Sequence, residues 1–371
     1  MRDDTKLTRR VSVNAGFDRG SRRRINYCVI ALRKAGLQSG SRLFIMLFGA
    51  KHGPWRLRVW FTASLILLLV FGVDSFGQTH TAPDAAGKAL HAIEQGRLSE
   101  AEALLEEAVR AEPSNANYAF ALANVYLVSK KPKLAIPVLQ KCLRLTPGDW
   151  DARIALAQAY QNVDADSEAI RTLGTVPPPG RRAALWRFSR AFSLYRLGDA
   201  GGAEPLFKQL LENKEMQAPA NFFLANCYSE MTKYGDALPY YETAIEYGQG
   251  TDNKVLNIYY YNYGLTLFKL GRYDKARDAF EKSAQRFADD PLPWYYLGRC
   301  EVQLGNFERA RDAFETAIEK NNSFNPAYYQ LARLYAAHGD RAKAEELYGK
   351  VSKELHRQLK ESEQLKFGNS Q

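Results

Sequence analysis

The stretch PWYYLGRCEVQLGNFERARDAF, Pro293–Phe314, decides the fold, because part of it is written twice in the chain. The hexapeptide ARDAFE occupies residues 276–281 and returns at residues 310–315. The stretch contains no His, no Ser and no glycine-rich phosphate loop. A sequence that repeats without carrying reactive groups indicates a structural unit rather than a catalytic motif.

The spacing of residues inside this stretch predicts two short helices that pack against each other. Residues at i, i+3, i+4 and i+7 share one face of a helix, and here they are Trp294, Leu297, Gly298 and Glu301. The facing stripe of the second helix is Ala310, Phe314 and Ala317. Between them, Gly305 can end one helix in the left-handed region and Asn306 can cap the next. The stretch therefore predicts a helical hairpin.

The same hairpin can be followed along most of the chain at a constant step. An alanine recurs at Ala101, Ala135, Ala169, Ala203, Ala237, Ala276, Ala310 and Ala344, and every gap equals the step from 276 to 310 except that from Ala237 to Ala276, which is longer by five. Four residues after each alanine stands a large apolar residue, namely Leu105, Leu139, Leu173, Phe207, Tyr241, Phe280, Phe314 or Tyr348. Twelve residues before each alanine stands a small residue, namely Ala89, Ala123, Ala157, Ala191, Ala225, Gly264, Gly298 or Ala332. Small residues let two backbones approach closely and the large residue fills the remaining space, so the pattern predicts eight stacked hairpins.

This pattern resembles the tetratricopeptide repeat (TPR), a unit of about 34 residues with small, aromatic, alanine and proline residues at fixed places. The resemblance covers about residues 82 to 356 and implies an all-α fold, a right-handed α-solenoid of about eight TPR helix hairpins plus a C-terminal capping helix. Glu301 departs from the pattern, because an aromatic residue fills its place in other units, at Tyr126, Tyr160, Tyr228 and Tyr335. Arg187 and Arg190 replace apolar residues in the fourth unit, and the segment VPPPG, 176–180, shortens the second helix of the third.

The domain organisation follows from this repeat. Residues 82–248 are expected to hold TPR units 1–5 and residues 257–356 to hold TPR units 6–8 with the cap. The additional residues of the long gap fall near 249–256, which we expect to form an insertion or a bend. A polar helix from Val351 is suited to cover the open end of the array, because a terminal unit must not expose its apolar face. The chain from 357 to 371 is expected to be the end of this cap and a disordered tail.

The net positive charge of the chain comes from its leader. Residues 1–58 hold 14 Lys and Arg against 3 Asp and Glu, whereas the remainder holds 37 against 38. Nucleic-acid affinity depends mainly on cationic side chains that displace counterions. Because residues 59–371 are neutral overall, the sequence argues against a nucleic-acid partner.

The leader has the layout of an export signal. An uncharged apolar run, 59–73, follows Arg56 and Arg58, and it is shorter than the roughly 20 residues of an ordinary membrane-spanning helix. Small residues precede a possible cut at Gln78, so residues 59–77 are interpreted as a signal peptide core or a signal anchor. Residues 1–58 are a basic leader that is either a mis-called start, with translation from Met46, or a cytoplasmic n-region.

These alternatives set the expected location. A cleaved signal makes the repeats exported, periplasmic or otherwise extracytoplasmic, and an uncleaved one anchors them to the inner membrane with the TPR body outside. Membrane contact is then expected only through residues 59–73. An arginine-rich mitochondrial transit segment is the third alternative. The body contains only Cys142, Cys227 and Cys300 and no C-x-x-C pair, so these cysteines are expected to be small core residues, in some tension with export.

No chemistry is expected from the repeats. The five His never fall at metal-ligand spacing on one helix face. No carboxylate pair, activated nucleophile or phosphate loop accompanies the repeats, and Glu308, Asp312 and Glu315 have Arg neighbours, as on a solvated helix surface. We therefore expect no enzyme, no cofactor and no metal.

The resemblance implies a concave groove, lined by the first helices, that holds a peptide or helix of a partner protein. The aromatic residues at groove places are Phe120, Phe188, Phe192, Phe222, Tyr261, Tyr295, Tyr296 and Tyr329. The polar residues among them are Asn124, Asn226, Asn262, Gln330, Arg299 and Arg333. Aromatic rings supply apolar contact and amides can hold an extended backbone, although each ring has the alternative of belonging to the core between repeats. Asn226 and Asn262 are the amides for which packing gives no reason.

Some family members clamp the C-terminal carboxylate of a chaperone with Lys and Arg plus two Asn. Phe222, Leu292 and Tyr296 stand where these cations belong, so a terminal carboxylate is not the expected ligand. The sequence favours a non-enzymatic adaptor for a protein or peptide partner in envelope assembly, secretion or pilus-type machinery. The alternative is an accessory protein that binds polysaccharide or assists its synthesis.

Overall fold

The computed structural model describes residues 82–250 and 253–351, and the leader and the end of the predicted cap lie outside these residues. Every regular element within them is a helix. The chain divides into two compact units, with the first ending at Cys227 and the second beginning at Tyr228. This division falls inside α12 (Gln217–Glu230). The predicted insertion at 249–256 lies within the second unit, and its residues 251–252 lie outside the described residues.

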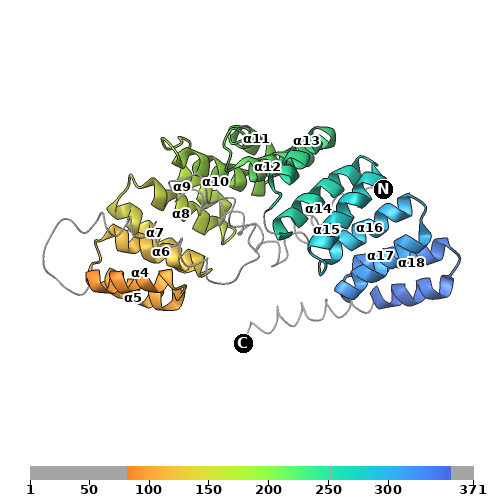
Figure 1. Ribbon diagram of the computed structural model, residues 1–371, viewed down its shortest axis with the longest axis horizontal. Coiled ribbons are helices and arrows are strands. Elements are labelled where there is room, and N and C mark those ends of the chain that lie inside the picture. Colours follow the sequence, from red (N-terminus) through yellow and green to blue (C-terminus); the bar gives the residue numbers. More distant parts are fainter. Residues whose placement is uncertain (1–81, 251–252, 352–371) are drawn as a thin grey trace, which may run out of the picture. The chain divides into compact units, whose positions relative to one another are not determined.

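Helices in the first unit follow one another as antiparallel pairs joined by short turns (Figure 1). Before α12 they are α4 (Ala82–Glu94), α5 (Leu98–Ala111), α6 (Ala116–Val128), α7 (Pro132–Leu145), α8 (Trp150–Gln161), α9 (Asp166–Leu173), α10 (Arg182–Arg196) and α11 (Ala200–Lys208). Among these, each first helix packs on its own second helix, as α6 does on α7, and each second helix packs on the next first helix, as α7 does on α8. The second unit repeats this packing with α13 (Tyr234–Tyr247), α14 (Asn253–Lys269), α15 (Tyr273–Arg286), α16 (Pro291–Gln303), α17 (Phe307–Lys320) and α18 (Asn325–Ala337). A further helix occupies residues 341–351.

The order and the packing of these helices confirm the hairpins predicted from the repeat. The pair over α16 and α17 is the stretch on which the prediction rested. The segment VPPPG does shorten its hairpin, because α9 has 8 residues whereas α5, α7, α15 and α17 have 14 each. None of the helices within the described ranges combines the length and the apolar content that crossing a bilayer requires.

Turns between paired helices have the predicted glycine geometry, and aspartates cap some of the helices that follow them. Gly305 has a φ of 76°, in the left-handed region where a glycine is least strained. Asp199 caps α11 by accepting the Gly202 N–H at 2.8 Å. Asn306 occupies the equivalent place before α17 but makes no side-chain cap. Its amide instead donates to Glu301 at 2.7 Å, so the predicted cap by Asn306 is wrong.

The core between the two helices of a hairpin is built from the small and large residues of the repeat. Leu105, Leu139, Phe280 and Phe314 are completely buried. A Cβ placed on Gly298 would lie 2.6 Å from Cε1 of Phe314, closer than real contacts allow. The glycine is therefore required by the approach of the ring and not by its backbone angles. Tyr348 holds the last large place and is 37% exposed, because within the described residues no further hairpin covers it.

Candidate functional site

Two columns of side chains run along the first helices of the hairpins. The first, here named the ring column, lies three residues before each small residue from Ala123 onward and contains Phe120, Ile154, Phe188, Phe222, Tyr261, Tyr295 and Tyr329. The second, named the polar column, lies one residue after each of the same small residues and contains Asn124, Gln158, Phe192, Asn226, Leu265, Arg299 and Arg333. Members of the two columns stand four residues apart and therefore share one helix face. Every residue predicted to line the groove lies in these columns except Asn262, Tyr296 and Gln330, each of which directly follows a member of the ring column.

In the first unit, Phe120 is buried among mostly aliphatic side chains, and the other three predicted groove rings pack against rings of the same unit. Phe188 lies edge-on to Phe207 and Phe223, with ring centroids 5.8 and 5.7 Å apart, and Phe192 lies edge-on to Phe223 at 5.3 Å. Phe222 contacts Phe223 at 5.2 Å. Such edge-to-face contacts each contribute about 0.5–1.5 kcal/mol beyond the area that the rings bury. Phe188 and Phe192 therefore have a packing role that accounts for them without a partner.

The predicted asparagines are not equally accessible. Asn226 is 7% exposed, and Asn124 is half-buried. Asn262 is half-buried on α14, and its amide donates to the carbonyl oxygen of Ile258 at 2.9 Å in the same helix. Its side-chain oxygen remains the group with which Asn262 could hold a partner backbone.

In the second unit, the structure gathers predicted residues around the guanidinium group of Arg299. The Cζ atom of Arg299 lies 4.7 Å from the ring centre of Phe268, 5.3 Å from that of Tyr296 and 5.7 Å from that of Tyr295. Tyr296 also stacks on Phe280 at 5.3 Å. We name Phe268, Tyr295, Tyr296 and Arg299 the Arg299 cluster. An arginine stacked on rings is held in one orientation while the edge of its guanidinium can still donate hydrogen bonds.

Tyr296 of the Arg299 cluster and Tyr261, whose ring lies 5.8 Å from it, remain neutral. Burial raises the pKa of Tyr261 well above its ordinary value, and burial likewise raises the pKa of Tyr296. The positive charge of Arg299 and its hydrogen bond with Tyr296 oppose the second shift without reversing it. The hydroxyl of Tyr296 is thus an uncharged partner of Arg299, and it leaves the positive charge of the guanidinium uncompensated.

One hairpin further, α18 presents the equivalent pair without the stacking. Tyr329 is 48% exposed and contacts only the ring of Tyr348, at 5.8 Å, among the ring contacts of the described residues. Arg333 is exposed four residues later. Since α16 contacts α18 directly, the structure brings the Tyr295–Arg299 pair and the Tyr329–Arg333 pair onto neighbouring helices.

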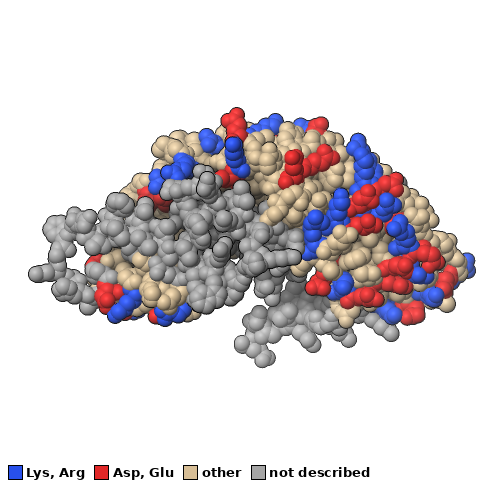
Figure 2. Space-filling model, in the orientation of Figure 1, with Lys and Arg blue, Asp and Glu red and all other residues tan. Residues whose placement is uncertain are grey.

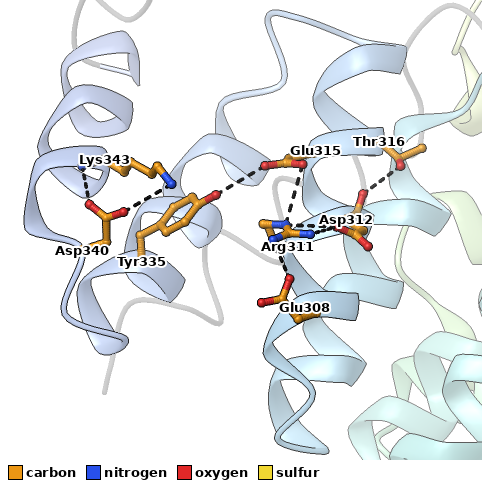
Figure 3. Close-up of polar contacts among 8 residues, drawn as sticks. All are labelled: Glu308, Arg311, Asp312, Glu315, Thr316, Tyr335, Asp340 and Lys343. Carbon is orange, nitrogen blue, oxygen red and sulfur yellow. Dashed lines mark hydrogen bonds and ion pairs between the residues drawn. The ribbon is translucent and has the colours of Figure 1, made fainter.

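The second helices of this unit carry a different surface, with acidic and basic side chains interspersed over α15 and α17 (Figure 2). Arg311 contacts Glu308 at 2.5 Å and Asp312 at 2.6 Å, and Glu315 lies at 4.0 Å (Figure 3). The same Glu315 is within 3.5 Å of the Tyr335 hydroxyl on α18. The expectation of a solvated face of ion pairs is confirmed for these residues, and such exposed pairs contribute little to stability.

Sequence reasoning missed the role of Glu301. This carboxylate is 2% exposed, accepts a hydrogen bond from Asn306 at 2.7 Å and lies 3.4 Å from Arg309. In other hairpins a tyrosine at the same place bonds to the preceding hairpin, as Tyr126 does when its hydroxyl donates to Glu106 at 2.7 Å. The departure from the aromatic pattern at Glu301 was the available signal. Because Glu301 is buried, α16 presents no accessible carboxylate.

The described residues contain no group of three or more His, Cys, Asp and Glu side chains placed to hold a metal ion. Cys142, Cys227 and Cys300 are buried, and Cys142 and Cys300 are free thiols. Burial raises the pKa of Cys300 to about 12, so its thiol stays protonated and unreactive. The groups that the described first helices offer to a partner are thus rings, amides and arginines.

A set of helix hairpins with one recurring small and large residue, and with rings, amides and arginines in register along the first helices, defines a helical repeat protein of the α-solenoid class. Models of the tetratricopeptide repeat family match residues 87–149 and 261–326, residues 215–289, and residues 129–190 and 305–365. The chain belongs to the tetratricopeptide repeat family. Proteins of this family are generally scaffolds for protein interaction.

Three known proteins are similar to this chain in sequence or in fold. The chain is 25% identical over 312 residues to the cellulose synthase operon protein C of Pseudomonas fluorescens (strain SBW25), a match that covers 76% of this chain and 24% of that protein. It is 34% identical over 97 residues to the peroxisomal targeting signal receptor of Komagataella phaffii (strain GS115 / ATCC 20864), covering 26% of this chain and 17% of the receptor. The chain thus spans about a quarter or less of the length of these relatives. A tetratricopeptide repeat protein from Parabacteroides merdae ATCC 43184 is similar in fold, with a TM-score of 0.52, 16% identity, and coverage of 74% of this chain and all of that one.

Proposed function

We propose that this protein is a non-enzymatic adaptor that binds a peptide or a helix of a partner protein on the first helices of its hairpins. The observation that carries the proposal is the pairing of an accessible ring with an accessible arginine on α18, and of their partly exposed equivalents on α16. Tyr329 is 48% exposed, so its ring is available to contact a partner. Aromatic and arginine side chains are the residues that most often dominate protein interfaces.

The location of this activity is proposed from the leader, which lies outside the described residues. The apolar run at 59–73 after Arg56 and Arg58 supports export or anchoring, with the repeats outside the inner membrane. On this basis the partner belongs to envelope assembly, secretion or a pilus-type machine. Sequencing the N-terminus of the native protein by mass spectrometry tests this location. A start near Gln78 requires cleavage after export, and a start at Met1 or Met46 contradicts cleavage.

The second candidate is an accessory role in polysaccharide synthesis. It is favoured by the similarity of most of this chain to a protein named for a cellulose synthase operon. Exposed rings such as Tyr329 could also stack on sugars. Binding to glycan-coated beads, with competition by free glycan, would favour this candidate over the adaptor.

The adaptor proposal is tested by replacing the two groove amides together. In the double variant Asn226→Ala and Asn262→Ala, we expect partner capture from envelope extract to fall while the helical circular dichroism signal stays unchanged. A matched control is Gln249→Ala, which removes an amide bonded to the carbonyl oxygen of Ile245 at the end of a second helix, away from the first-helix face. Lost helicity in the double variant would instead show that these amides are core groups.

A further inference from the structure

The first and second helices of the second unit differ in charge. Among the described side chains of α14, α16 and α18, the only carboxylate is Glu301, and it is buried against Asn306 and Arg309. Asp290, just before α16, is 9% exposed and accepts the N–H of Leu292 as a helix cap. The second helices α15 and α17 instead contain seven Asp and Glu residues. The described parts of α14, α16 and α18 therefore offer cations without accessible acids of their own.

Arg299 and Arg333 are the cations of that face at equivalent places of the repeat. Within residues 228–250 and 253–351, neither arginine forms an ion pair, whereas Arg277, Arg309 and Arg311 on the second helices all do. The charge of Arg299 rests on rings and on the neutral hydroxyl of Tyr296. An arginine fixed on rings loses little side-chain entropy when it binds a carboxylate through both nitrogens.

We propose that α16 and α18 recognise an acidic, partly apolar segment of a partner protein, with Arg299 and Arg333 each binding a carboxylate side chain and Tyr295 and Tyr329 contacting the apolar residues between. This inference rests on the proposed adaptor function and names the chemistry of its partner. It differs from recognition of a chain end, because each arginine takes a side-chain carboxylate and the ligand needs no free C-terminus.

The spacing of the two arginines selects the form of the ligand. Packed helices lie about 8–10 Å apart, and a chain in the polyproline II conformation advances about 3.1 Å per residue with three residues per turn. Carboxylates at every third place of such a segment lie on one side of it and are separated by about 9 Å, which matches neighbouring helices. An acidic residue at every third place, with an apolar residue between, is the pattern that fits this face.

The probe is a fluorescent peptide of four Ser-Leu-Glu triplets, acetylated and amidated so that it has no terminal charge, and its matched control replaces every Glu by Gln. Binding to the full-length protein is measured by fluorescence anisotropy at low and at physiological salt. We expect the Glu peptide to bind at least about tenfold more tightly than the Gln peptide. Equal affinities, or no binding of the Glu peptide, would overturn the inference.

The variants Arg299→Gln and Arg333→Gln are each expected to weaken binding of the Glu peptide about tenfold and to leave binding of the Gln peptide unchanged. Arg341→Gln is the control, because Arg341 is an exposed arginine of the same unit that lies outside both columns, and its loss should change the affinity less than twofold. Arg333 is exposed, so its variant is expected to fold even if Arg299→Gln does not. An equal loss in Arg341→Gln would show that only net charge matters, and the inference would fail.

Two further outcomes separate this inference from the adaptor function. If a thymidine oligonucleotide displaces the Glu peptide at lower concentration than unlabelled peptide does, the site selects phosphate and the inference fails. If the variant Arg299→Gln with Arg333→Gln still captures the same envelope protein as the native chain, the adaptor function stands and acidic recognition falls.

Discussion

The early hairpins of the first unit and the α14 and α16 hairpins of the second fill the same space in two ways. In the first three hairpins, the small residue is alanine and the large one is leucine, as at Ala123 and Leu139. On α14 and α16, the small residue is glycine and the large one on the paired helix is phenylalanine, as at Gly298 and Phe314. A methyl group removed from one helix is matched by a larger ring on the other, so these hairpins conserve the volume between their helices.

The hairpin of α10 and α11 shows what else a ring at this place can do. It pairs Ala191 with Phe207, and both are completely buried. The ring of Phe207 stacks on Phe223 at 5.5 Å and lies edge-on to Phe188. The glycine of the second unit is therefore required by the way the Phe314 ring lies against α16, and not by phenylalanine as such.

Removing the large residue of a hairpin is expected to cause the largest loss of stability. Phe314→Ala should destabilise the fold by about 3–5 kcal/mol, because the ring is completely buried and a large cavity remains. Leu139→Ala, at the equivalent buried place, should cost about 2–5 kcal/mol and less than the phenylalanine variant. Urea unfolding followed by circular dichroism measures both. A smaller loss at Phe314 than at Leu139 would contradict the argument from volume.

A rescue experiment tests whether the glycine and the phenylalanine are energetically coupled. Gly298→Ala should cost about 1–3 kcal/mol, because the new methyl group would lie 2.6 Å from the Phe314 ring. Adding Phe314→Leu to this variant recreates the alanine and leucine of the first three hairpins and should recover most of that loss. Ala123→Gly is the matched control, for which helix propensity alone predicts a cost of about 0.5–1 kcal/mol. Additive losses in the double variant would show that the two residues are not coupled.

The aromatic place of the repeat holds Glu301 in the second unit and Tyr126 in the first. Substitutions at this place are expected to lower stability less than loss of the large residue. Glu301→Ala should cost about 1–3 kcal/mol, since it leaves the amide of Asn306 without its bond and a gap in a buried site. Tyr126→Phe removes only the hydrogen bond to Glu106 and should cost about 0.5–1.5 kcal/mol. Thermal unfolding of the two variants ranks them. Equal midpoints would mean that burial of the carboxylate has no net effect.

The smallest effect on stability is expected at the proposed ligand contacts. Arg299→Gln should lower the free energy of unfolding by about 1 kcal/mol or less, because it loses cation–π contacts at a partly exposed site. Phe192→Leu in the first unit should cost more, about 1–3 kcal/mol, because that ring is 1% exposed among other rings. The two are compared by urea unfolding. A larger loss at Arg299 would assign it to packing rather than to ligand binding.

The hairpins, their order and the residues that pack inside each one could be predicted from the sequence alone. These follow from local spacing, because a helix places residues three and four apart on one face and a constant repeat length brings the same face back. The glycines of the turns, such as Gly305, were predictable for the same local reason. The repeat could not predict that Asn306 would turn toward Glu301, since the buried carboxylate then competes with the helix cap for its side chain.

The exposure of residues that hold the same place in the repeat depends on how the helices pack, so it could not be predicted from the sequence. Phe188 and Tyr329 hold the same place in the repeat, yet Phe188 meets the rings of Phe207 and Phe223 while Tyr329 is 48% exposed. Phe192 and Arg299 likewise share a column. Only their contacts show that Phe192 packs inside against Phe223, whereas the guanidinium of Arg299 lies over the ring of Phe268. The physical reason is that a place on a helix fixes the direction of a side chain, whereas the side chains of neighbouring helices fix what it meets.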